Sequence, residues 1–131
     1  MTIKEVSEKY GISADTLRYY ERVGVIPAVN RNKSGIRDYN RDDLNWVENA
    51  ICMRQAGLSV EFLVEYLGLY QQGNTTFKAR LDLLSEQREL LLLQFKQLQE
   101  TIEKLNYKIS RYENAVQTGI LSWDDKGEKE C

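Results

Sequence analysis

The chain of 131 residues carries 18 basic and 20 acidic side chains, a formal net charge of −2, and 42% of its residues are hydrophobic. This composition excludes a disordered chain, and the single proline and eight glycines exclude a collagen-like or proline-rich architecture. No apolar run approaches the roughly 20 residues that span a bilayer, and no signal peptide precedes the first amphipathic segment. We therefore expect a cytoplasmic protein with no membrane partner.

Histidine is absent from the chain, and the only cysteines are Cys52 and Cys131. The commonest general base, the Ser-His and Cys-His nucleophile arrangements and most metal sites are therefore excluded. Two cysteines do not make a disulfide framework. The sequence predicts a protein that is not an enzyme and that holds no metal and no cofactor.

The first helices are predicted from their capping residues. Thr2 can cap a helix that Gly11 ends, and Ser13 can cap a second helix that runs to about Val23. Two short helices joined by a tight turn that contains glycine are typical of a helix-turn-helix. Three residues of the second helix have the spacing of a core face: Leu17, Tyr20 and Val23.

Residues 24–39 lack helical periodicity and contain Pro27 together with asparagine, serine and glycine. This pattern predicts a two-strand ribbon with a polar tip. A third helix is expected from residue 42 or 43 to Gln55, and a fourth, capped by Ser59, is expected to run to Leu69.

A polar linker, with its hinge at residues 73–76, precedes a long heptad repeat and ends in a threonine that can cap a helix. Residues 77–118 contain no glycine or proline, and their apolar residues recur at alternate spacings of three and four. Arg88 is the one charged position in this seam. The two series that form it are Phe77, Leu84, Leu91, Leu98, Leu105 and Tyr112, and Leu81, Arg88, Phe95, Ile102, Ile109 and Val116.

The seam needs a partner. A helix of about 42 residues is roughly 63 Å long, and an exposed apolar stripe of that length is not stable alone. Because the chain has no second long helix, we predict a homodimer. The alternative is that the helix packs on residues 1–72 of its own chain, although that region is too short to cover it. In the C-terminal tail, residues 119–131, we expect Ile120, Leu121 and Trp123 to dock back, followed by a frayed end.

Basic residues gather between Asp15 and Arg41. Six cations face three acids there, a local charge of +3, and tyrosines lie among them. A basic stripe interleaved with tyrosines is typical of a phosphate-binding surface, although a solvated surface without a ligand is the alternative. The six cations are Arg18, Arg22, Arg31, Lys33, Arg37 and Arg41.

Three segments resemble the winged helix-turn-helix domain of the MerR family of transcriptional regulators. They read TLRYYERVGVIP at 16–27, RNKSGIRDY at 31–39 and CMRQAGLSVEFL at 52–63. The resemblance implies a mainly α fold: a DNA-binding domain over residues 1–72, then an antiparallel coiled-coil helix over 77–118 that joins a homodimer. It further implies an activator that binds double-stranded promoter DNA at a dyad and distorts it so that RNA polymerase can use the promoter.

The resemblance also implies the contact residues. The second helix would enter the major groove, and the ribbon would act as a wing on the flanking backbone. The residues that match the recognition helix are Ser13, Thr16, Arg18, Tyr19 and Tyr20. Those that match the wing are Arg31, Lys33, Arg37 and Tyr39, and Arg54 matches a further phosphate contact. Tyr20 has a competing interpretation as a core residue.

Cys52 is the candidate sensor. A helical wheel places it outside the apolar arc of its helix, although a lone cysteine is usually a small buried residue. The segment CMRQAGLS resembles the aldehyde- and nitrosative-stress branch of the family (NmlR/AdhR-like), in which the one cysteine of the third helix is the proposed sensor. The resemblance implies a stress response to an electrophile such as an aldehyde or a quinone.

Two alternatives remain open at this point. In the first, the regulator senses an oxidant or a noncovalent ligand, and Cys52 is structural. In the second, the chain is a structural DNA-binding or coiled-coil adaptor that does not activate a promoter. Because residues 73–130 contain no cysteine or histidine, a soft-metal sensor at the coiled coil is not expected.

Overall fold

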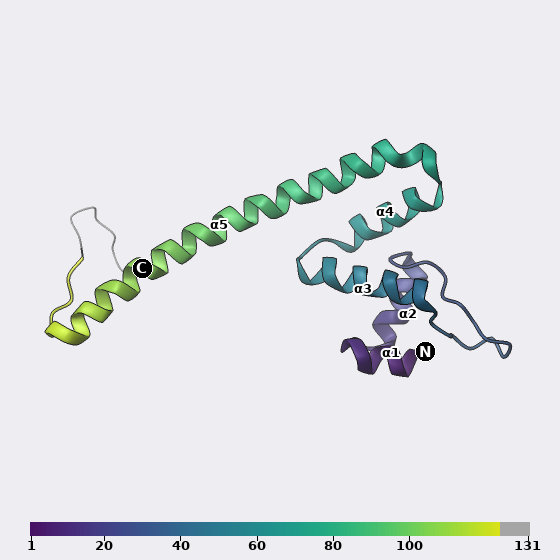
Figure 1. Cartoon of the computed structure of the whole chain (residues 1–131), viewed down its shortest axis with the longest axis horizontal. Coiled ribbons are helices and arrows are strands. Elements are labelled where there is room, and N and C mark those ends of the chain that lie inside the picture. Colours follow the sequence, from purple (N-terminus) through teal and green to yellow (C-terminus); the bar gives the residue numbers. More distant parts are fainter. Residues whose placement is uncertain (124–131) are drawn as a thin grey trace. The chain divides into compact units, whose positions relative to one another are not determined.

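The computed structural model describes residues 1–123, and its regular elements are helices (Figure 1). The mainly α fold class is therefore as predicted. The chain divides into two compact units, one of residues 1–87 and one that begins at Arg88. The elements are α1 (Ile3–Tyr10), α2 (Ala14–Val23), α3 (Arg41–Gln55), α4 (Val60–Gln71), the 3₁₀ turn η1 (Asn74–Thr76) and α5 (Phe77–Thr118).

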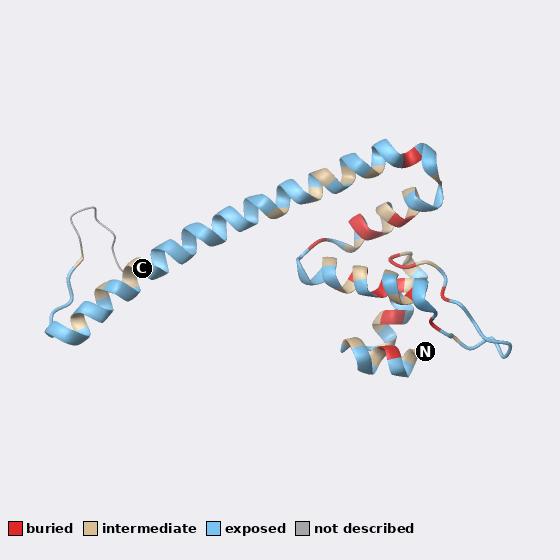
Figure 2. Ribbon diagram, viewed as in Figure 1, coloured by how far each residue is buried: buried red, intermediate tan, exposed pale blue. Residues whose placement is uncertain are grey.

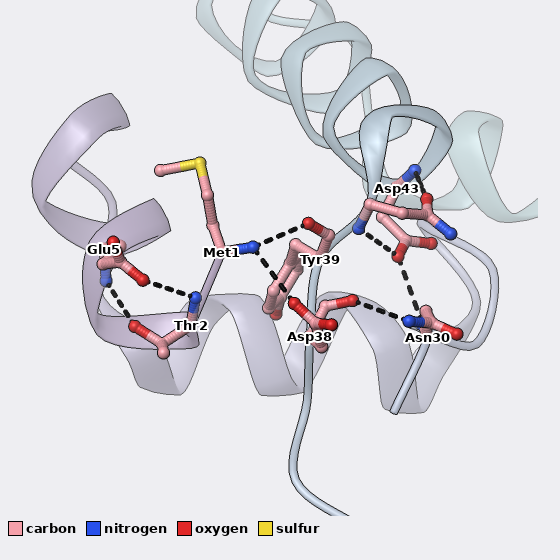
Figure 3. Close-up of polar contacts among 8 residues, drawn as sticks. Met1, Thr2, Glu5, Asn30, Asp38, Tyr39 and Asp43 are labelled. Carbon is pink, nitrogen blue, oxygen red and sulfur yellow. Dashed lines mark hydrogen bonds and ion pairs between the residues drawn. The ribbon is translucent and has the colours of Figure 1, made fainter. Parts of the chain in front are cut away.

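The predicted caps begin and end the first two helices. The backbone amide of Glu5 donates to Thr2 Oγ1 (3.1 Å) while the amide of Thr2 donates to Glu5 Oε1 (2.9 Å), a reciprocal capping box (Figure 3). Ser13 Oγ accepts from the amide of Thr16 at 3.0 Å. Gly11 ends α1 with a φ of 65°, which glycine adopts without strain. These contacts end α1 and begin α2 with a short turn between them, as in a helix-turn-helix.

α3 begins at Arg41, slightly earlier than predicted, because Asn40 and Asp43 cap it reciprocally. The buried carboxylate of Asp43 also accepts from the backbone amide of Asn30 at 3.1 Å, so the cap fastens the preceding loop to α3 (Figure 3). Ser59 caps α4 as predicted, and the helix continues past Leu69 to Gln71.

The core of the first unit lies where α1 to α4 and the loop after α2 meet (Figure 2). Leu17 and Ile26 are almost completely buried, and removal of such side chains from water is the main stabilising contribution to a small helical unit. The buried apolar residues are Val6, Leu17, Tyr20, Val25, Ile26, Val29, Tyr39, Val47, Ala50, Leu58, Phe62, Leu63 and Leu67.

The predicted two-strand ribbon is reduced to one antiparallel bridge between Arg31 and Arg37, and the described residues contain no longer strand. The Asn32 amide donates to the Ile36 carbonyl at 2.9 Å, and Asn32 Oδ1 accepts from the Ile36 amide at 3.1 Å. A turn with Gly35 at φ 80° follows directly inside the bridge. The ladder does not extend beyond this bridge because the Ile36 amide donates to the Asn32 side chain rather than to the Asn32 backbone carbonyl. This loop, which we call the wing (residues 30–38), projects from the first unit (Figure 1).

The linker before α5 is folded rather than open. The Thr76 hydroxyl, which we expected to cap α5, instead lies within hydrogen-bond distance of the Leu69 carbonyl at 2.6 Å and the Gly73 carbonyl at 2.8 Å. Arg80 Nε donates to the same hydroxyl oxygen at 3.0 Å. Thr76 thus joins the end of α4 to the first turns of α5, because a buried hydroxyl requires hydrogen-bond partners.

α5 covers residues 77–118, and none of its residues is buried (Figure 2). The apolar seam remains open to solvent, with Leu98 62% and Leu81 60% exposed. Among the helices of residues 1–123, none is both long and apolar enough to pass through a bilayer.

Trp123 docks back on the end of α5, as predicted. Its ring lies 6.0 Å from that of Tyr107 and 5.9 Å, edge to face, from that of Tyr112 (centroid distances). Ile120 and Leu121 remain exposed, which corrects the expectation that they dock. The predicted frayed end at residues 124–131 lies outside the described residues.

The burial of Leu17 leads to a stability prediction. Leu17→Ala leaves a cavity between helices and should lower the free energy of unfolding by about 2–5 kcal/mol. Arg22→Ala, at an exposed site of the same helix, should change it by less than about 0.5 kcal/mol. Urea denaturation followed by circular dichroism measures both, and equal effects would mean that this face of α2 is not the core face.

Candidate nucleic-acid interface

The exposed face of α2 carries cations and an aromatic ring. Asp15, Arg18, Tyr19 and Arg22 are spaced three and four apart, so they share one face of the helix. Arg18 Nη1 donates to Asp15 Oδ1 at 2.9 Å, and the guanidinium carbon of Arg22 lies 5.4 Å from the Tyr19 ring centroid. The sequence predicts Arg22 as part of the basic stripe only, but its spacing of four from Arg18 places it on the same face as that predicted contact residue.

The hydroxyls of Ser13 and Thr16 stand at the N-terminus of this helix, 2.8 Å apart. Both residues take part in the cap, and Ser13 is exposed. A helix N-terminus with hydroxyls and free backbone amides favours an anion. This is consistent with the prediction that both residues belong to the recognition-helix contacts.

Glu21 joins the wing to α2. Arg37 Nε donates to Glu21 Oε1 at 2.7 Å, and Arg31 Nη2 lies 3.9 Å from Glu21 Oε2. The backbone amide of Val29 also donates to this carboxylate, at 3.1 Å. One acid of α2 thus contacts two wing arginines and ties the wing to that helix.

The ionised form of Glu21 is stabilised by these partners. Burial alone would raise the pKa of the carboxyl, but the hydrogen bonds from Arg37 and Val29 and the charges of Arg37 and Arg31 outweigh it and hold the pKa below its ordinary value. Glu21 therefore remains charged throughout the neutral range.

The three acids of the basic stretch are all engaged by cations. Asp15 pairs with Arg18, Glu21 with Arg37, and Asp38 with the amino group of Met1 at 3.2 Å (Figure 3). Within residues 1–123, Arg22, Lys33 and Arg41 have no acidic side chain within ion-pair distance. The cations of the basic stretch without an acidic partner thus lie on the exposed face of α2, at the wing tip and at the start of α3.

Two predicted contact residues are core residues instead. Tyr20 is 7% exposed and Tyr39 is 2% exposed, so neither ring lies on the surface. Burial raises the pKa of the Tyr39 hydroxyl, which has no hydrogen-bond partner among the described residues. The competing interpretation of Tyr20 as a core residue holds, and Tyr39 has a similar role at the base of the wing.

Arg54 lies at the end of α3 and has a structural partner. Its Nη1 donates to the Leu58 carbonyl at 2.7 Å, which bridges the turn between α3 and α4. The side chain is nevertheless exposed, so the rest of its guanidinium is available to an anion.

Cys52 is exposed on α3, away from the buried residues Asp43, Val47 and Ala50 of that helix. This exposure confirms the position outside the apolar arc that the helical wheel predicts. Among the described residues, no group of three acidic, cysteine or histidine side chains is arranged to hold a metal ion. Cys131 lies outside the described residues.

The comparisons with known proteins agree with this geometry. The family model described as MerR HTH family regulatory protein matches residues 1–68, which include α1 to α3 and most of α4. The chain belongs to the MerR family. The chain is therefore a MerR-type transcriptional regulator that binds DNA, and not an enzyme.

Two curated relatives support the assignment to the family. The HTH-type transcriptional regulator AdhR of Bacillus subtilis is 50% identical over 92 residues, which are 70% of this chain and 66% of that protein. An uncharacterized HTH-type transcriptional regulator of Haemophilus influenzae is 31% identical over 120 residues, 92% of this chain and 89% of the relative. The match to AdhR thus spans slightly less than two thirds of its length.

Two solved structures share the fold. One is a putative MerR family transcriptional regulator from Listeria monocytogenes, with 44% identity, a TM-score of 0.85, and coverage of 91% of this chain and 90% of that chain. The other is HiNmlR, described as a MerR family regulator that lacks the sensor domain and is bound to promoter DNA. It has 31% identity, a TM-score of 0.78, and coverage of 90% of this chain and 94% of that chain.

The lowered pKa of Glu21 leads to a pH prediction. A depressed folded-state pKa contributes stability above the unfolded value of about 4.3, and this contribution is lost as pH falls through the folded value. Glu21→Gln should therefore be less stable than the unchanged chain at pH 7, and the difference should shrink as pH falls below about 4.3. Urea titrations between pH 3 and 7 measure it. A difference that is constant with pH would mean that the charge of Glu21 is not what holds the wing.

Proposed function

We propose that this regulator binds a promoter dyad as a homodimer, activates transcription by DNA distortion, and responds to an electrophile at Cys52. In each subunit α2 lies in the major groove and the wing lies on the flanking backbone. The observation that carries the proposal is the contact of Glu21 on α2 with Arg37 and Arg31, which joins the helix that carries exposed cations to the wing.

The surface has the two kinds of group that DNA recognition requires. Arg18 and Arg22 offer forked donors to phosphate or to base edges, and Tyr19 offers a neutral hydroxyl beside them. Lys33 at the wing tip adds a cation that tolerates a range of phosphate positions. The HiNmlR structure, which is bound to promoter DNA and covers almost the same length of chain, supports the proposal that this chain binds promoter DNA.

The dimer is proposed to form through the open seam of α5. Large apolar side chains recur along one stripe of the helix and are about half exposed in a single copy. Burial against a second α5 removes this area from water and satisfies the knobs-into-holes pattern of a coiled coil. We propose the antiparallel orientation, which carries the two DNA-binding units at opposite ends. The contact residues are Phe77, Leu81, Leu84, Leu91, Phe95, Leu98, Ile102, Leu105, Ile109 and Tyr112.

RNA polymerase and duplex promoter DNA are the proposed partners, in the cytoplasm. Two α2 helices fixed at opposite ends of one dimer bind half-sites whose separation and twist the protein dictates. If the distance or angle between them changes, the DNA between the half-sites must bend or untwist to keep both contacts. This is how a protein without catalytic groups can change the use of a promoter.

Cys52 is the proposed sensor because its thiol is exposed on α3, on the side away from the core. The thiolate sulfur adds to an electrophilic carbonyl carbon, and the carbonyl π electrons move to oxygen, which takes up a proton. The resulting hemithioacetal is larger and more polar than the thiol. The relative AdhR, 50% identical over its matched region, supports a place in the same branch.

In vitro transcription tests the sensor directly. The unchanged chain should respond to a small aldehyde on its own upstream promoter, and Cys52→Ser should bind the same DNA without a response. Cys131→Ser is the matched control and should respond normally. If Cys52→Ser responds like the unchanged chain, the signal is an oxidant or a noncovalent ligand and Cys52 is structural. If neither the unchanged chain nor Cys52→Ser activates transcription, the chain is a DNA-binding or coiled-coil adaptor.

The exposed Arg18 should contact phosphate. Arg18→Ala is expected to weaken operator binding and to reduce the slope of log K against log salt by about one unit, because one fewer counterion is released. Lys78→Ala, at an exposed cation on α5, serves as the control and should leave the slope unchanged. Fluorescence anisotropy at several salt concentrations measures both, and an unchanged slope for Arg18→Ala rejects a phosphate contact.

A charge placed in the seam should break the dimer. Leu98→Asp puts a carboxylate near the middle of the proposed interface, where it would be buried without a partner. The variant should be monomeric at micromolar concentration in analytical ultracentrifugation and should bind the operator weakly. Glu100→Asp, outside the seam, should remain dimeric. A Leu98→Asp dimer at micromolar concentration would place the interface elsewhere.

A further inference from the structure

A pocket of about 330 Å³ lies on the first unit, between α3, α4 and the start of α5. This volume falls in the range of small-molecule sites. One wall is a stripe along α3 at spacings of three and four, and the other is the facing side of α4 with Leu84 of α5 at its edge. The α3 stripe is Asp42, Asn45, Trp46, Asn49 and Met53, and the α4 side is Phe62, Leu63, Tyr66 and Tyr70.

The aromatic rings of the pocket hold one another in place. The Trp46 ring lies edge to face with that of Tyr70 at 5.1 Å, and it lies 6.4 Å from that of Tyr66. Phe62, in turn, lies 6.3 Å from Tyr66. Because each ring is fixed by a neighbour, a ligand would meet an aromatic wall that needs little reorganisation, which lowers the entropic cost of binding.

The polar groups of the pocket are acidic or neutral. The carboxylate of Asp42 and the amides of Asn45 and Asn49 stand on the α3 wall, and none of the lining residues is basic. In the part of the chain that the structure describes, Asp42 has no cation within ion-pair distance, whereas the adjacent carboxylate of Asp43 is committed to the backbone amides of Asn30 and Asn40. The charge of Asp42 is therefore available to a ligand.

We propose that this pocket binds a small organic cation that carries an aromatic ring, such as an arylalkyl ammonium. Aromatic faces attract a cation and stack with an aryl group, and Asp42 supplies the opposite charge. The guanidinium of Arg80 already lies 5.4 Å from the Tyr70 ring centroid. Because Tyr70 already has this cationic neighbour, the ligand's cation lies against Trp46 and Tyr66, on the side of Asp42.

The position of the pocket gives such a ligand a route to regulation. Asn49 and Met53 are lining residues on the helix that carries Cys52, and Leu84 belongs to the seam through which we propose dimerisation. A ligand that contacts α3, α4 and α5 at once favours one arrangement of the DNA-binding unit and the first turns of α5. This regulatory consequence rests on the proposed function, whereas the binding itself does not.

The binding test uses the full chain without DNA, so that it can fail independently of the proposed function. In a Trp123→Phe background Trp46 is the one remaining tryptophan, and its fluorescence reports the pocket. Benzyltrimethylammonium should quench it saturably, with a dissociation constant of about 1 mM or tighter. The uncharged carbon isostere neopentylbenzene should bind several times more weakly. No saturable quenching, or equal affinity for the two probes, overturns the proposal.

Two variants locate the charge. Asp42→Asn should weaken binding of benzyltrimethylammonium about three- to tenfold and leave neopentylbenzene unaffected. Glu61→Gln is the matched control, since Glu61 is an acid in the first turn of α4 that does not line the pocket, and it should change binding less than about twofold. Equal effects of the two variants overturn the assignment to Asp42.

A second copy of the chain is the competing occupant. If the monomeric variant Leu98→Asp binds the cation and the unchanged dimer does not, the partner subunit fills the pocket and the proposal is overturned. If both bind with similar affinity, the pocket is open in the dimer, as the proposal requires.

Discussion

The apolar seam of α5 is the constraint on which the rest of this structure depends. In one copy the helix has no buried residue, and leucine, isoleucine and phenylalanine side chains stand open to water along most of its length. Burial of this apolar area against a partner stabilises association by about 25 cal/mol for each Å² removed from water. The proposed dimer, the dyad that it reads and the distortion of the promoter all follow from covering this one surface with a second copy of itself.

The DNA-binding unit is subject to a different constraint. It must present positive charge to DNA although the chain has a net charge of −2. It does so by local pairing: Glu21 forms ion pairs with the wing arginines, and Asp38 forms one with the amino group of Met1. The same Glu21 contact ties the wing to α2. α3 then carries two further features, the exposed thiol of Cys52 and the polar stripe of the aromatic pocket. Cys52 is three residues from Asn49 and seven from Asn45, so the thiol lies beside that stripe. A covalent and a noncovalent signal would therefore act on the same helix.

Local signals in the sequence predicted most of the helices. Thr2, Ser13 and Ser59 are capping residues whose effect reaches only three residues along the chain, and the heptad spacing of α5 is visible without any tertiary contact. The burial of Tyr39 was not predictable in this way, since it lies in a segment without periodicity. The pair between Glu21 and Arg37 joins residues 16 apart, and the pocket needs the register of α3 against α4. Such contacts depend on the packed arrangement, which no local pattern specifies.

The central claim is that two α5 helices pair in an antiparallel orientation. A distance between spin labels on the two helices tests it most directly. In a variant with Cys52→Ser and Cys131→Ser, one label is placed at Glu113→Cys and, in a second sample, at Gln97→Cys. An antiparallel dimer centred on residues 97–98 predicts about 46 Å between the labels at 113, from 1.5 Å per residue, and a short distance at 97. Distances shorter than about 25 Å at both positions would indicate a parallel coiled coil, with helix axes 8–10 Å apart along their length, and would contradict the account.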